Sequence, residues 1–396
     1  MIRNRTFLIA MGVFASYVLA FELLSFSLPL LALEISGTGT GLALIKGAGF
    51  IPNILFAIFI GVINDRIRKA AGFRVYTAVL AACTALLWLA MISGHLSVGG
   101  MAVFMIVFNA TGYALGNMQL TLIRLVVPER QLADATALTS GVHSTISTVA
   151  PALGGLALLW LGHTNLTGLV TALLGLCAFA AFAVRPPEAS PAPAPFWAAL
   201  KAGWHAFATN RDLVMMTIAV ILTNAAAGAA DVGLVLKLKT ALSLDSFTLG
   251  LVLAAAGLGA VLTASVAAPI RRKIGPRMAF YWPILILAAI YLGMMASTSV
   301  ILLAGLSFLE GAVSSFYNIS IWSYRQESVS AAHMGRVAGI TGSIFKLGLP
   351  PMILLSGLLA DTGTLWATFS LAALVSVSAA LFLSLSAKWG LPRRIQ

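Results

Sequence analysis

The sequence has 396 residues, of which 60% are hydrophobic and only 9% are charged, and its mean hydropathy is +0.99. So few polar side chains cannot cover a soluble domain of this length, and the composition therefore predicts a membrane protein. The formal net charge of +12 does not indicate a nucleic-acid-binding protein, because the basic residues are scattered over short loops rather than gathered on one soluble surface.

Twelve apolar runs follow one another along the chain, each long enough to cross a hydrocarbon core of about 30 Å as a helix. We expect them at residues 7–33, 41–63, 75–93, 100–122, 136–160, 165–184, 212–236, 247–270, 278–296, 299–322, 337–360 and 364–386. The runs are too long for barrel strands and lack strict two-residue alternation. The sequence therefore predicts an all-α membrane protein with twelve transmembrane helices.

The basic residues lie almost entirely on one side of these predicted helices. When successive helices alternate in direction, 20 of the 24 lysines and arginines fall on the face that also carries both ends of the chain. Basic loops stay in the cytoplasm, so both termini are expected there, in an inner (plasma) membrane of bacterial type. The exceptions are Lys46, Lys237, Lys239 and Lys346.

A stretch rich in Pro, Ala and Ser divides the predicted helices into two sets of six. We expect an N-terminal half at 1–184, a cytoplasmic linker with a short amphipathic helix at 185–211, and a C-terminal half at 212–396. A weak repeat supports the division, since RLVVPERQLADATALTSG (124–141) and RQESVSAAHMGRVAGITG (325–342) occupy matching places. Such parallel repeats are typical of transporters with a site near the membrane midplane.

The loop after the second predicted helix, GVINDRIRKAAGFR (61–74), concentrates charge between two apolar runs. Its residues Gly61, Asp65, Arg66 and Lys69 resemble the motif Gly-x-x-x-Asp-Arg-x-Gly-Arg/Lys-Arg/Lys of the major facilitator superfamily, although Arg68 stands at the second glycine. The resemblance covers essentially the whole chain and implies the twelve-helix fold of that family. It also implies that these four residues act as a conformational latch.

The fifth predicted helix contains GVHSTISTVAPALGG (141–155). Its Pro151, Gly154 and Gly155 resemble the antiporter motif of the same superfamily, in which proline bends the helix and glycines admit a neighbouring backbone. Ordinary packing of small residues between helices is the alternative. Together with VPERQLADATAL and SVSAAHMGRVAGI, the motif resembles the exporter branch that includes enterobactin exporters and macrolide efflux proteins.

Acidic residues inside the predicted helices are candidates for proton or substrate sites, because lipid disfavours a charge there. Glu22, Asp231 and Glu310 lie in the first, seventh and tenth predicted helices. The resemblance implies that these helices line the substrate cavity. A carboxylate removed from water is protonated more readily, so all three are candidates for proton coupling, although each alone is equally compatible with a buried hydrogen-bond donor.

Other polar residues extend this set. The resemblance implies that the fourth helix also lines the cavity, and it supplies Asn109, Asn117 and Gln119. Lys346 lies well inside the eleventh helix, where it can pair with an acid or meet an anionic substrate. Lys46 lies near the outer end of the second helix and is expected to reach the membrane surface along its flexible stem.

These features favour a proton-driven antiporter that exports an amphipathic small molecule, either a siderophore or a drug. A lipid or metal-ion transporter of the same fold is the alternative. A membrane-embedded enzyme is disfavoured because the acids lie on different helices, and the absence of a P-loop motif argues against an ATP-driven pump. We expect no cofactor and no bound metal. The expected partners are the substrate, protons and membrane lipids, but no nucleic acid, for a protein that works as a monomer.

Overall fold

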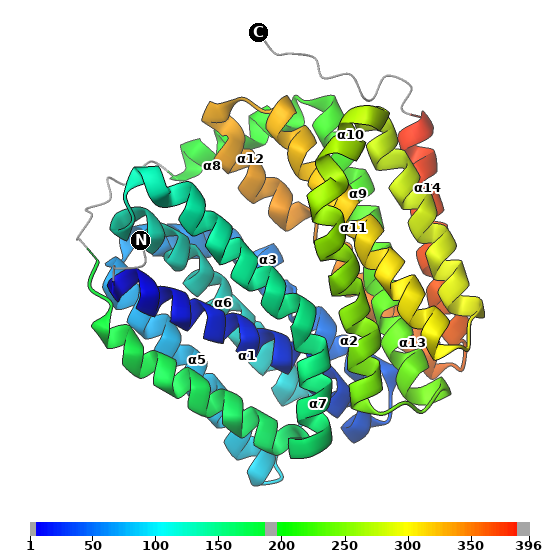
Figure 1. Cartoon of the computed structure of the whole chain (residues 1–396), viewed down its shortest axis with the longest axis horizontal. Coiled ribbons are helices and arrows are strands. Elements are labelled where there is room, and N and C mark those ends of the chain that lie inside the picture. The colour runs from blue at the N-terminus through cyan, green and yellow to red at the C-terminus, as the bar shows by residue number, and fades with distance from the viewer. Residues whose placement is uncertain (1–4, 187–195, 386–396) are drawn as a thin grey trace. The chain divides into compact units, whose positions relative to one another are not determined.

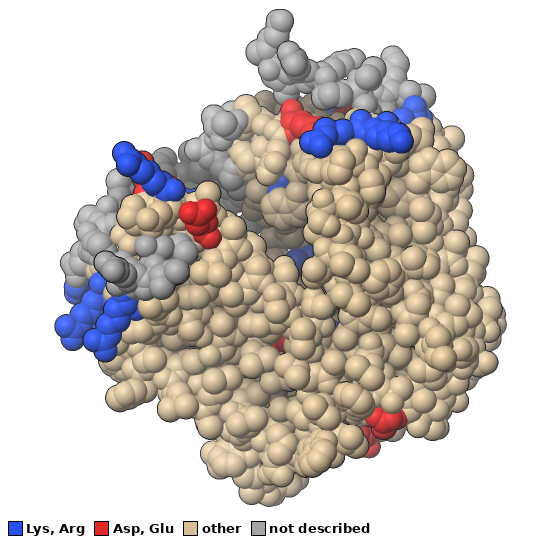
Figure 2. Space-filling view, in the orientation of Figure 1, with Lys and Arg blue, Asp and Glu red and all other residues tan. Residues whose placement is uncertain are grey.

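A computed structural model describes residues 5–186 and 196–385 (Figure 1). Within these ranges the ordered elements are all helical and no strand is present. Nine helices of the described chain are long and apolar enough to cross a membrane. Figure 2 shows that the visible flanks of these helices carry almost no charged side chains, as lipid-facing surfaces require. The predicted all-α membrane fold is confirmed.

The chain divides into two compact units. Unit 1 comprises Met1–Gly37 and Ala48–Ala194, and unit 2 comprises Thr38–Gly47 and Pro195–Gln396. Residues 38–47 therefore belong to unit 2, although they lie in the first half of the sequence. Part of the predicted linker, residues 187–195, lies outside the described residues.

Unit 1 is built from long helices that pack side by side. Its helices are α1 (Arg5–Ser36), α3 (Ile51–Leu55), α4 (Ala57–Arg66), α5 (Lys69–Ile92), α6 (Val98–Val126) and α7 (Leu132–Ala180), with short 3-10 turns at Glu129–Gln131 and Ala181–Ala183. Helix α1 packs against α6 and α7, and α5 packs against the same two helices. A buried cluster of Phe7, Met11, Ile123, Val127 and Ala135 joins α1, α6 and α7.

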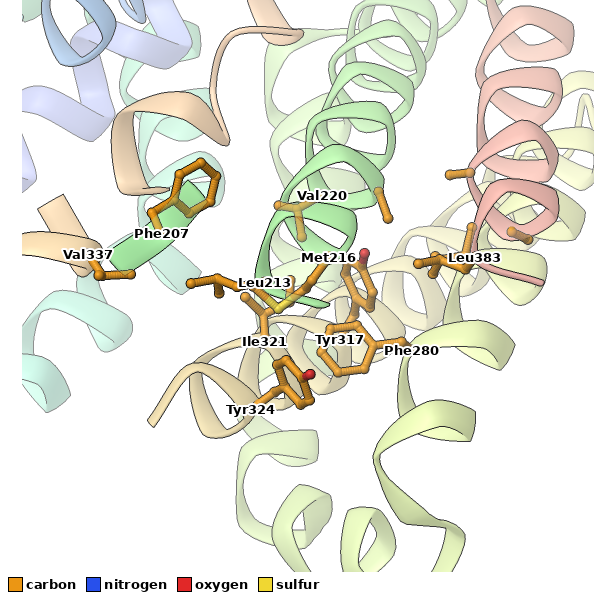
Figure 3. Packing of buried hydrophobic residues seen from close by; sticks show 14 residues of the cluster. Phe207, Leu213, Met216, Val220, Phe280, Tyr317, Ile321, Tyr324, Val337 and Leu383 are labelled. Atoms are coloured by element: carbon orange, nitrogen blue, oxygen red, sulfur yellow. The ribbon is translucent and has the colours of Figure 1, made fainter. Parts of the chain in front are cut away.

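Unit 2 contains α2 (Gly39–Ala48), α8 (Phe196–Ala208), α9 (Arg211–Leu236), a π-helical turn η3 (Lys237–Ala241), α10 (Ser246–Ala296), α11 (Val300–Ser328), α12 (Ala331–Ile344), α13 (Leu349–Asp361) and α14 (Leu365–Leu385). Its core gathers side chains from α8, α9, α10, α11, α12 and α14 (Figure 3). The Phe280 ring meets Tyr317 and Tyr324 edge to face, with ring centroids 5.8 and 5.7 Å apart. This aromatic contact fixes α10 against α11.

Two of the long helices are each two helices joined at a glycine. Gly162 in α7 has a φ angle of 69° and Gly275 in α10 has a φ angle of 79°. Only glycine adopts such angles without a steric penalty on its side chain. The predicted helices at 136–160 and 165–184 thus lie on either side of Gly162, and those at 247–270 and 278–296 lie on either side of Gly275.

Two other predicted helices are interrupted rather than continuous. The run at 41–63 is divided among α2, α3 and α4, and the run at 337–360 is divided into α12 and α13. The break between α2 and α3 lies just before Pro52, and the break between α12 and α13 lies just before Pro350 and Pro351, whereas the break at Phe56 between α3 and α4 has no proline beside it. Proline offers no N–H to the carbonyl four residues earlier and clashes with it, so the helix ends there. The hydropathy pattern alone does not reveal these interruptions.

Helix α8 is amphipathic. Phe207 is buried in the core of unit 2, while Trp204 is 53% exposed, and their ring centroids lie 5.6 Å apart. The helix packs against α9 and α12. One edge of α8 is therefore anchored in unit 2, and the other presents an indole ring of the kind that favours a membrane–water interface.

Candidate functional site

An ion pair joins α2 to α9 inside unit 2. Lys46 Nζ lies 2.5 Å from Asp231 Oδ2, and the side chains are 17% and 46% exposed, respectively. The Lys46 ammonium group has a carboxylate partner, and a partly desolvated charge is far less costly when it is paired.

The other end of α2 is held by a second carboxylate. Asp361, the last residue of α13, accepts hydrogen bonds from Gly39 N at 2.5 Å, from Thr40 N at 3.0 Å and from Thr40 Oγ1 at 2.5 Å. These backbone N–H groups belong to the first turn of α2 and have no partner within the helix. A Cβ atom on Gly357 would lie 2.7 Å from Gly39 O, so glycine is what lets α13 approach α2. Residues 38–47 are thus attached at both ends to the rest of unit 2.

Glu310 lies in α11, half-buried, and within electrostatic range of Asp231 and of the Tyr291 hydroxyl. Ser314 donates a hydrogen bond to Glu310 Oε1 at 3.3 Å. Close to Glu310, a Cβ atom on Gly311 would lie 1.9 Å from Ala256 O, so the backbones of α10 and α11 touch. This contact fixes the position of the Glu310 side chain relative to α10.

Lys346 lies in the break between α12 and α13, and its side chain is half-buried. Asn224 of α9 donates a hydrogen bond from Nδ2 to Phe345 O at 2.8 Å and so satisfies a carbonyl freed by the break. Gly348 allows the break to lie directly on α9, because a Cβ atom there would be 2.7 Å from Ile221 O. Sequence reasoning missed Asn224, whose role depends on the break.

Two of the four candidate polar residues of unit 1, Glu22 and Asn109, have hydrogen-bond partners. Ser147 of α7 donates a hydrogen bond to Glu22 Oε1 at 2.5 Å, and buried Asn109 donates to the backbone carbonyl of Met105 at 2.8 Å. Asn117 is half-buried on the same helix as Asn109. Gln119 is fully buried, and neither amide atom has a hydrogen-bond partner in the described chain. Among the described residues, no hydrogen bond joins the side chain of Asn109, Asn117 or Gln119 to Glu22.

The latch residues lie at the junction of α4 and α5. Gly61 and Asp65 belong to α4, and their side-chain surroundings lie outside what the structure describes, while Arg66 ends α4 with an exposed side chain. Lys69 Nζ donates a hydrogen bond to Asn64 O. Asn64, which sequence reasoning missed, is buried and anchors the junction.

Two hydrogen bonds show how Asn64 does so. Its Nδ2 donates to Ala114 O at 2.9 Å, and its Oδ1 accepts from Tyr76 Oη at 2.6 Å. One amide therefore ties α4 to both α6 and α5. The sequence offered a faint indication, since an asparagine at a helix end inside an apolar run needs a buried partner.

The glycines of the fifth predicted helix do provide close packing. A Cβ atom on Gly154 would lie 3.0 Å from Phe26 Cδ1, and both Gly154 and Gly155 are buried. Pro151 lies inside α7. Gly154 thus lies where α7 packs closely on α1.

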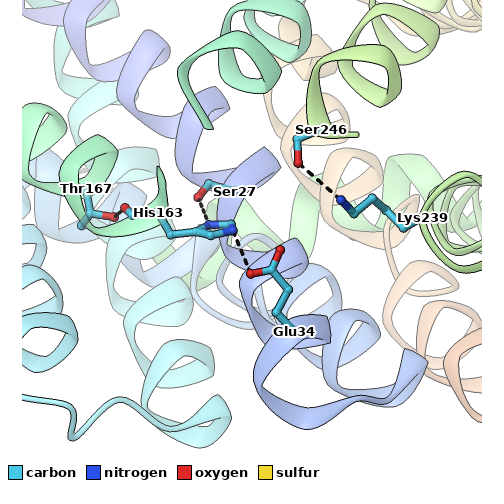
Figure 4. A network of polar contacts seen from close by, with 6 residues as sticks. All are labelled: Ser27, Glu34, His163, Thr167, Lys239 and Ser246. Carbon is cyan, nitrogen blue, oxygen red and sulfur yellow. Dashed lines mark hydrogen bonds and ion pairs between the residues drawn. The ribbon is translucent and has the colours of Figure 1, made fainter. Parts of the chain in front are cut away.

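A histidine network near the Gly162 turn was not anticipated. His163 Nδ1 lies 2.8 Å from Ser27 Oγ, and Nε2 lies 3.4 Å from Glu34 Oε2 (Figure 4). The network joins α7 to α1. The sequence holds one indication of it: the fifth predicted helix ends at residue 160, which places His163 outside the hydrocarbon core. A polar network has a low desolvation cost there.

In the described part of the chain, no group of three or more His, Cys, Asp or Glu side chains is placed to hold a metal ion. The polar sites are instead single carboxylates and ammonium groups on membrane helices. Such groups can bind protons or polar parts of a small molecule.

Comparisons with known proteins agree with this architecture. Similar solved structures include a variant of the nucleoside transporter NupG (13% identity, 96% of this chain and 100% of that chain, TM-score 0.77). Another is an auto-inhibited peptide transporter of the POT family (13% identity, 99% and 98%, TM-score 0.76). A third is a bacterial homolog of the human lysosomal transporter Spinster (14% identity, 97% and 95%, TM-score 0.72). At these identities the likeness shows the fold alone.

No curated protein that was compared with this chain matches it in sequence. The family model described as Major Facilitator Superfamily matches residues 9–351. That match covers most of the chain, and the fold is that of secondary transporters rather than of an enzyme. The chain belongs to the Major Facilitator Superfamily.

Proposed function

We propose that this protein is a proton-coupled exporter of an amphipathic small molecule, of the siderophore or drug type, that works by alternating access. The loop motif at 61–74 and the helix motif at 141–155 support the exporter branch. The distribution of basic residues supports cytoplasmic termini in a bacterial-type inner membrane. Nine candidate spans, two of them divided at glycines, and the interrupted stretch from α2 to α4 support twelve crossings in two six-helix halves. We propose that it acts as a monomer.

The observation that carries this proposal is the Lys46–Asp231 pair. A proton that binds the Asp231 carboxylate removes its negative charge and leaves the Lys46 ammonium group without a counter-charge. The pair then loses its attraction, and residues 38–47 lose one of their two attachments to unit 2. Proton binding is in this way converted into a movement of α2, which is what coupling requires.

Glu310 is the second proton carrier that we propose. It lies within electrostatic range of Asp231, so a proton that one of the two carboxylates releases can pass to the other, between α9 and α11, during the cycle. Glu22 lies in unit 1 with Ser147 as its partner, and we assign it to substrate contact.

The junction of α4 and α5 is proposed as the latch. Lys69 holds the carbonyl of Asn64, and Asn64 is anchored to two other helices. Gly61, Asp65 and Arg66 belong to the same helix α4 that Asn64 anchors. An anchored helix end is suited to hold one conformation and to release it as a unit.

The test uses proteoliposomes with an imposed pH gradient and an internal pH-sensitive dye. Siderophores, cationic dyes and lysophospholipids are added in turn, and proton movement and probe accumulation are recorded together. We expect coupled movement with at least one siderophore or dye. Asp231→Asn and Glu310→Gln should each lower uphill transport about tenfold or more, because the proton-binding group is lost.

The matched control is Asp245→Asn, which neutralises a carboxylate outside the membrane helices. It should retain coupled transport. Undiminished uphill transport in both Asp231→Asn and Glu310→Gln would show that neither carboxylate carries the proton. Probe movement without any proton movement in the wild-type protein would exclude proton coupling.

A further inference from the structure

Four lysines lie outside the predicted cytoplasmic loops, and three of them have clear partners. Lys46 pairs with Asp231. Lys237 is buried and donates to Met294 O and Met295 O at 2.7 and 2.8 Å, so it caps the end of α10. Lys239 donates to Ser246 Oγ at 3.4 Å (Figure 4). These three ammonium groups are explained by the fold.

Lys346 is the fourth, and no described residue serves as its side-chain partner. The two carboxylates of unit 2 that lie within membrane helices are already engaged, Asp231 with Lys46 and Glu310 with Ser314. Lys346 lies midway between Ala331, which begins α12, and Asp361, which ends α13. An ammonium group this far from either end of a membrane crossing is costly unless it has a function.

A structural role at the break would be the simplest explanation, because lysines often cap the carbonyl groups at a helix end. The carbonyls here already have donors. Phe345 N bonds Thr341 O at 2.9 Å, Lys346 N bonds Ser343 O at 3.2 Å and Leu347 N bonds Ile344 O at 3.1 Å. Asn224 satisfies Phe345 O. The Lys346 side chain is therefore not needed to complete the break.

The backbone N–H groups at the start of α13 are not sufficient to bind an anion. Leu349 N is bonded to Lys346 O at 3.1 Å, and the next two residues, Pro350 and Pro351, have no N–H. The first turn of α13 thus has few free donors, unlike helix starts that bind phosphate. Any anion at this break depends on the ammonium group of Lys346.

We infer that Lys346 binds a negatively charged group of the transported molecule, so that the substrate is an amphipathic anion. This inference rests on the proposed transport function and specifies its substrate class. The break presents a single strong donor on a backbone that is fixed against α9 by Asn224 and by the close approach at Gly348. A carboxylate or phosphate that meets this donor forms a charge-assisted hydrogen bond. A cationic drug would meet repulsion at the same place.

The test measures equilibrium binding without any pH gradient, so its outcome is independent of proton coupling. Three probes share one ring system and differ in charge: 2-naphthoate, 2-naphthamide and 2-naphthylmethylammonium. Protein in lipid nanodiscs should bind the anion about tenfold more tightly than the amide. Lys346→Gln should remove that preference while leaving amide binding unchanged, and Lys346→Arg should retain most of it.

Lys239→Gln serves as the matched control, because it removes a lysine whose partner is a local serine. Its preference for the anion should equal that of the wild-type protein. Equal binding of all three probes by the wild-type protein would overturn the inference, and so would an undiminished anion preference in Lys346→Gln. If the proteoliposomes show no proton-driven transport but binding still prefers the anion and this preference depends on Lys346, only the proposed proton coupling is contradicted.

Discussion

Two helices of unit 2 have an aspartate side chain that caps the free backbone N–H groups of their first turn, but the two aspartates lie at different places in the chain. Asp245 directly precedes α10, and its Oδ1 accepts from Phe247 N and Thr248 N at 2.9 Å each. Helix α2 is capped by Asp361, which is 322 residues from Gly39 in the sequence. The chemistry is the same, whereas the first cap is local and the second joins two distant segments.

The difference shows that a capping side chain can do more than stabilise the first turn of a helix. A carboxylate at the start of α2 is favoured by the helix dipole, but the same carboxylate at the end of α13 is disfavoured by that helix. Asp361 is therefore in place because α2 is in place. A local cap stabilises one helix, while a remote cap makes the position of one helix depend on another.

The largest effect is expected when α2 is pushed away from α13. In Gly357→Val, the Cβ atom alone would lie 2.6 Å from Ala43 Cβ and 2.7 Å from Gly39 O. The two helices must separate, and the Asp361 cap is lost with the packing. We expect a loss of about 3 kcal/mol or more of stability and strongly reduced transport.

Thermal unfolding in detergent measures this change. Gly305→Val is the control, because a Cβ atom at Gly305 meets nothing within 4 Å. It should cost far less than Gly357→Val. Similar melting temperatures for the two variants would show that α2 and α13 are not in close contact.

A smaller effect is expected when only the remote cap is removed. Asp361→Ala leaves Gly39 N and Thr40 N without their acceptor while the helix packing stays intact. Because the site is partly exposed, we expect a loss of about 1–2 kcal/mol. Hydrogen exchange followed by mass spectrometry should show faster exchange at residues 38–47 than elsewhere in unit 2. Uniformly unchanged exchange in that segment would contradict the remote cap.

The local cap should give the smallest effect and a distinct pH dependence. Hydrogen bonds from the Thr248 backbone and hydroxyl lower the pKa of Asp245 below its ordinary value. Because this pKa is lower in the folded than in the unfolded protein, the ionised carboxylate stabilises the fold at any pH above the unfolded-state pKa. The stabilisation is lost as the pH falls through the folded-state pKa, where the carboxylate becomes protonated. Asp245→Ala should cost about 0.5–1 kcal/mol at pH 7. Its melting temperature should approach that of the wild-type protein below about pH 4, and a constant difference would refute this.

Much of the fold could be predicted because the bilayer constrains the sequence so strongly. Apolar runs mark the membrane helices, and their predicted ends at 160 and 165 fall on either side of Gly162, where the structure joins two of them. The interruption at Lys346 was not predicted, although Pro350 and Pro351 are visible in the sequence. Prolines in membrane helices are often tolerated as kinks, so a full break depends on a neighbour such as Asn224 to donate a hydrogen bond to the freed carbonyl.

The partners of the candidate residues were beyond prediction for a different reason. Asp231 was identified from its place in an apolar helix, but its partner Lys46 lies 185 residues away. Hydropathy describes each helix by itself and carries no information about which helices meet. Gln119 was predicted to line the substrate cavity for the same reason. Its neighbours in the sequence do not show that its amide is buried without a hydrogen bond.

The attachment of α2 by Asp361 also sets an order of events during protein synthesis. Gly39 leaves the ribosome 322 residues before its carboxylate partner, which at ordinary elongation rates is roughly 20–60 s. Throughout that interval the first turn of α2 has no acceptor, and Lys46 has no counter-charge until Asp231 follows. The attachments of α2 therefore cannot all form before nearly the whole chain has been made, and a chain that ends before Asp231 leaves Lys46 without that counter-charge.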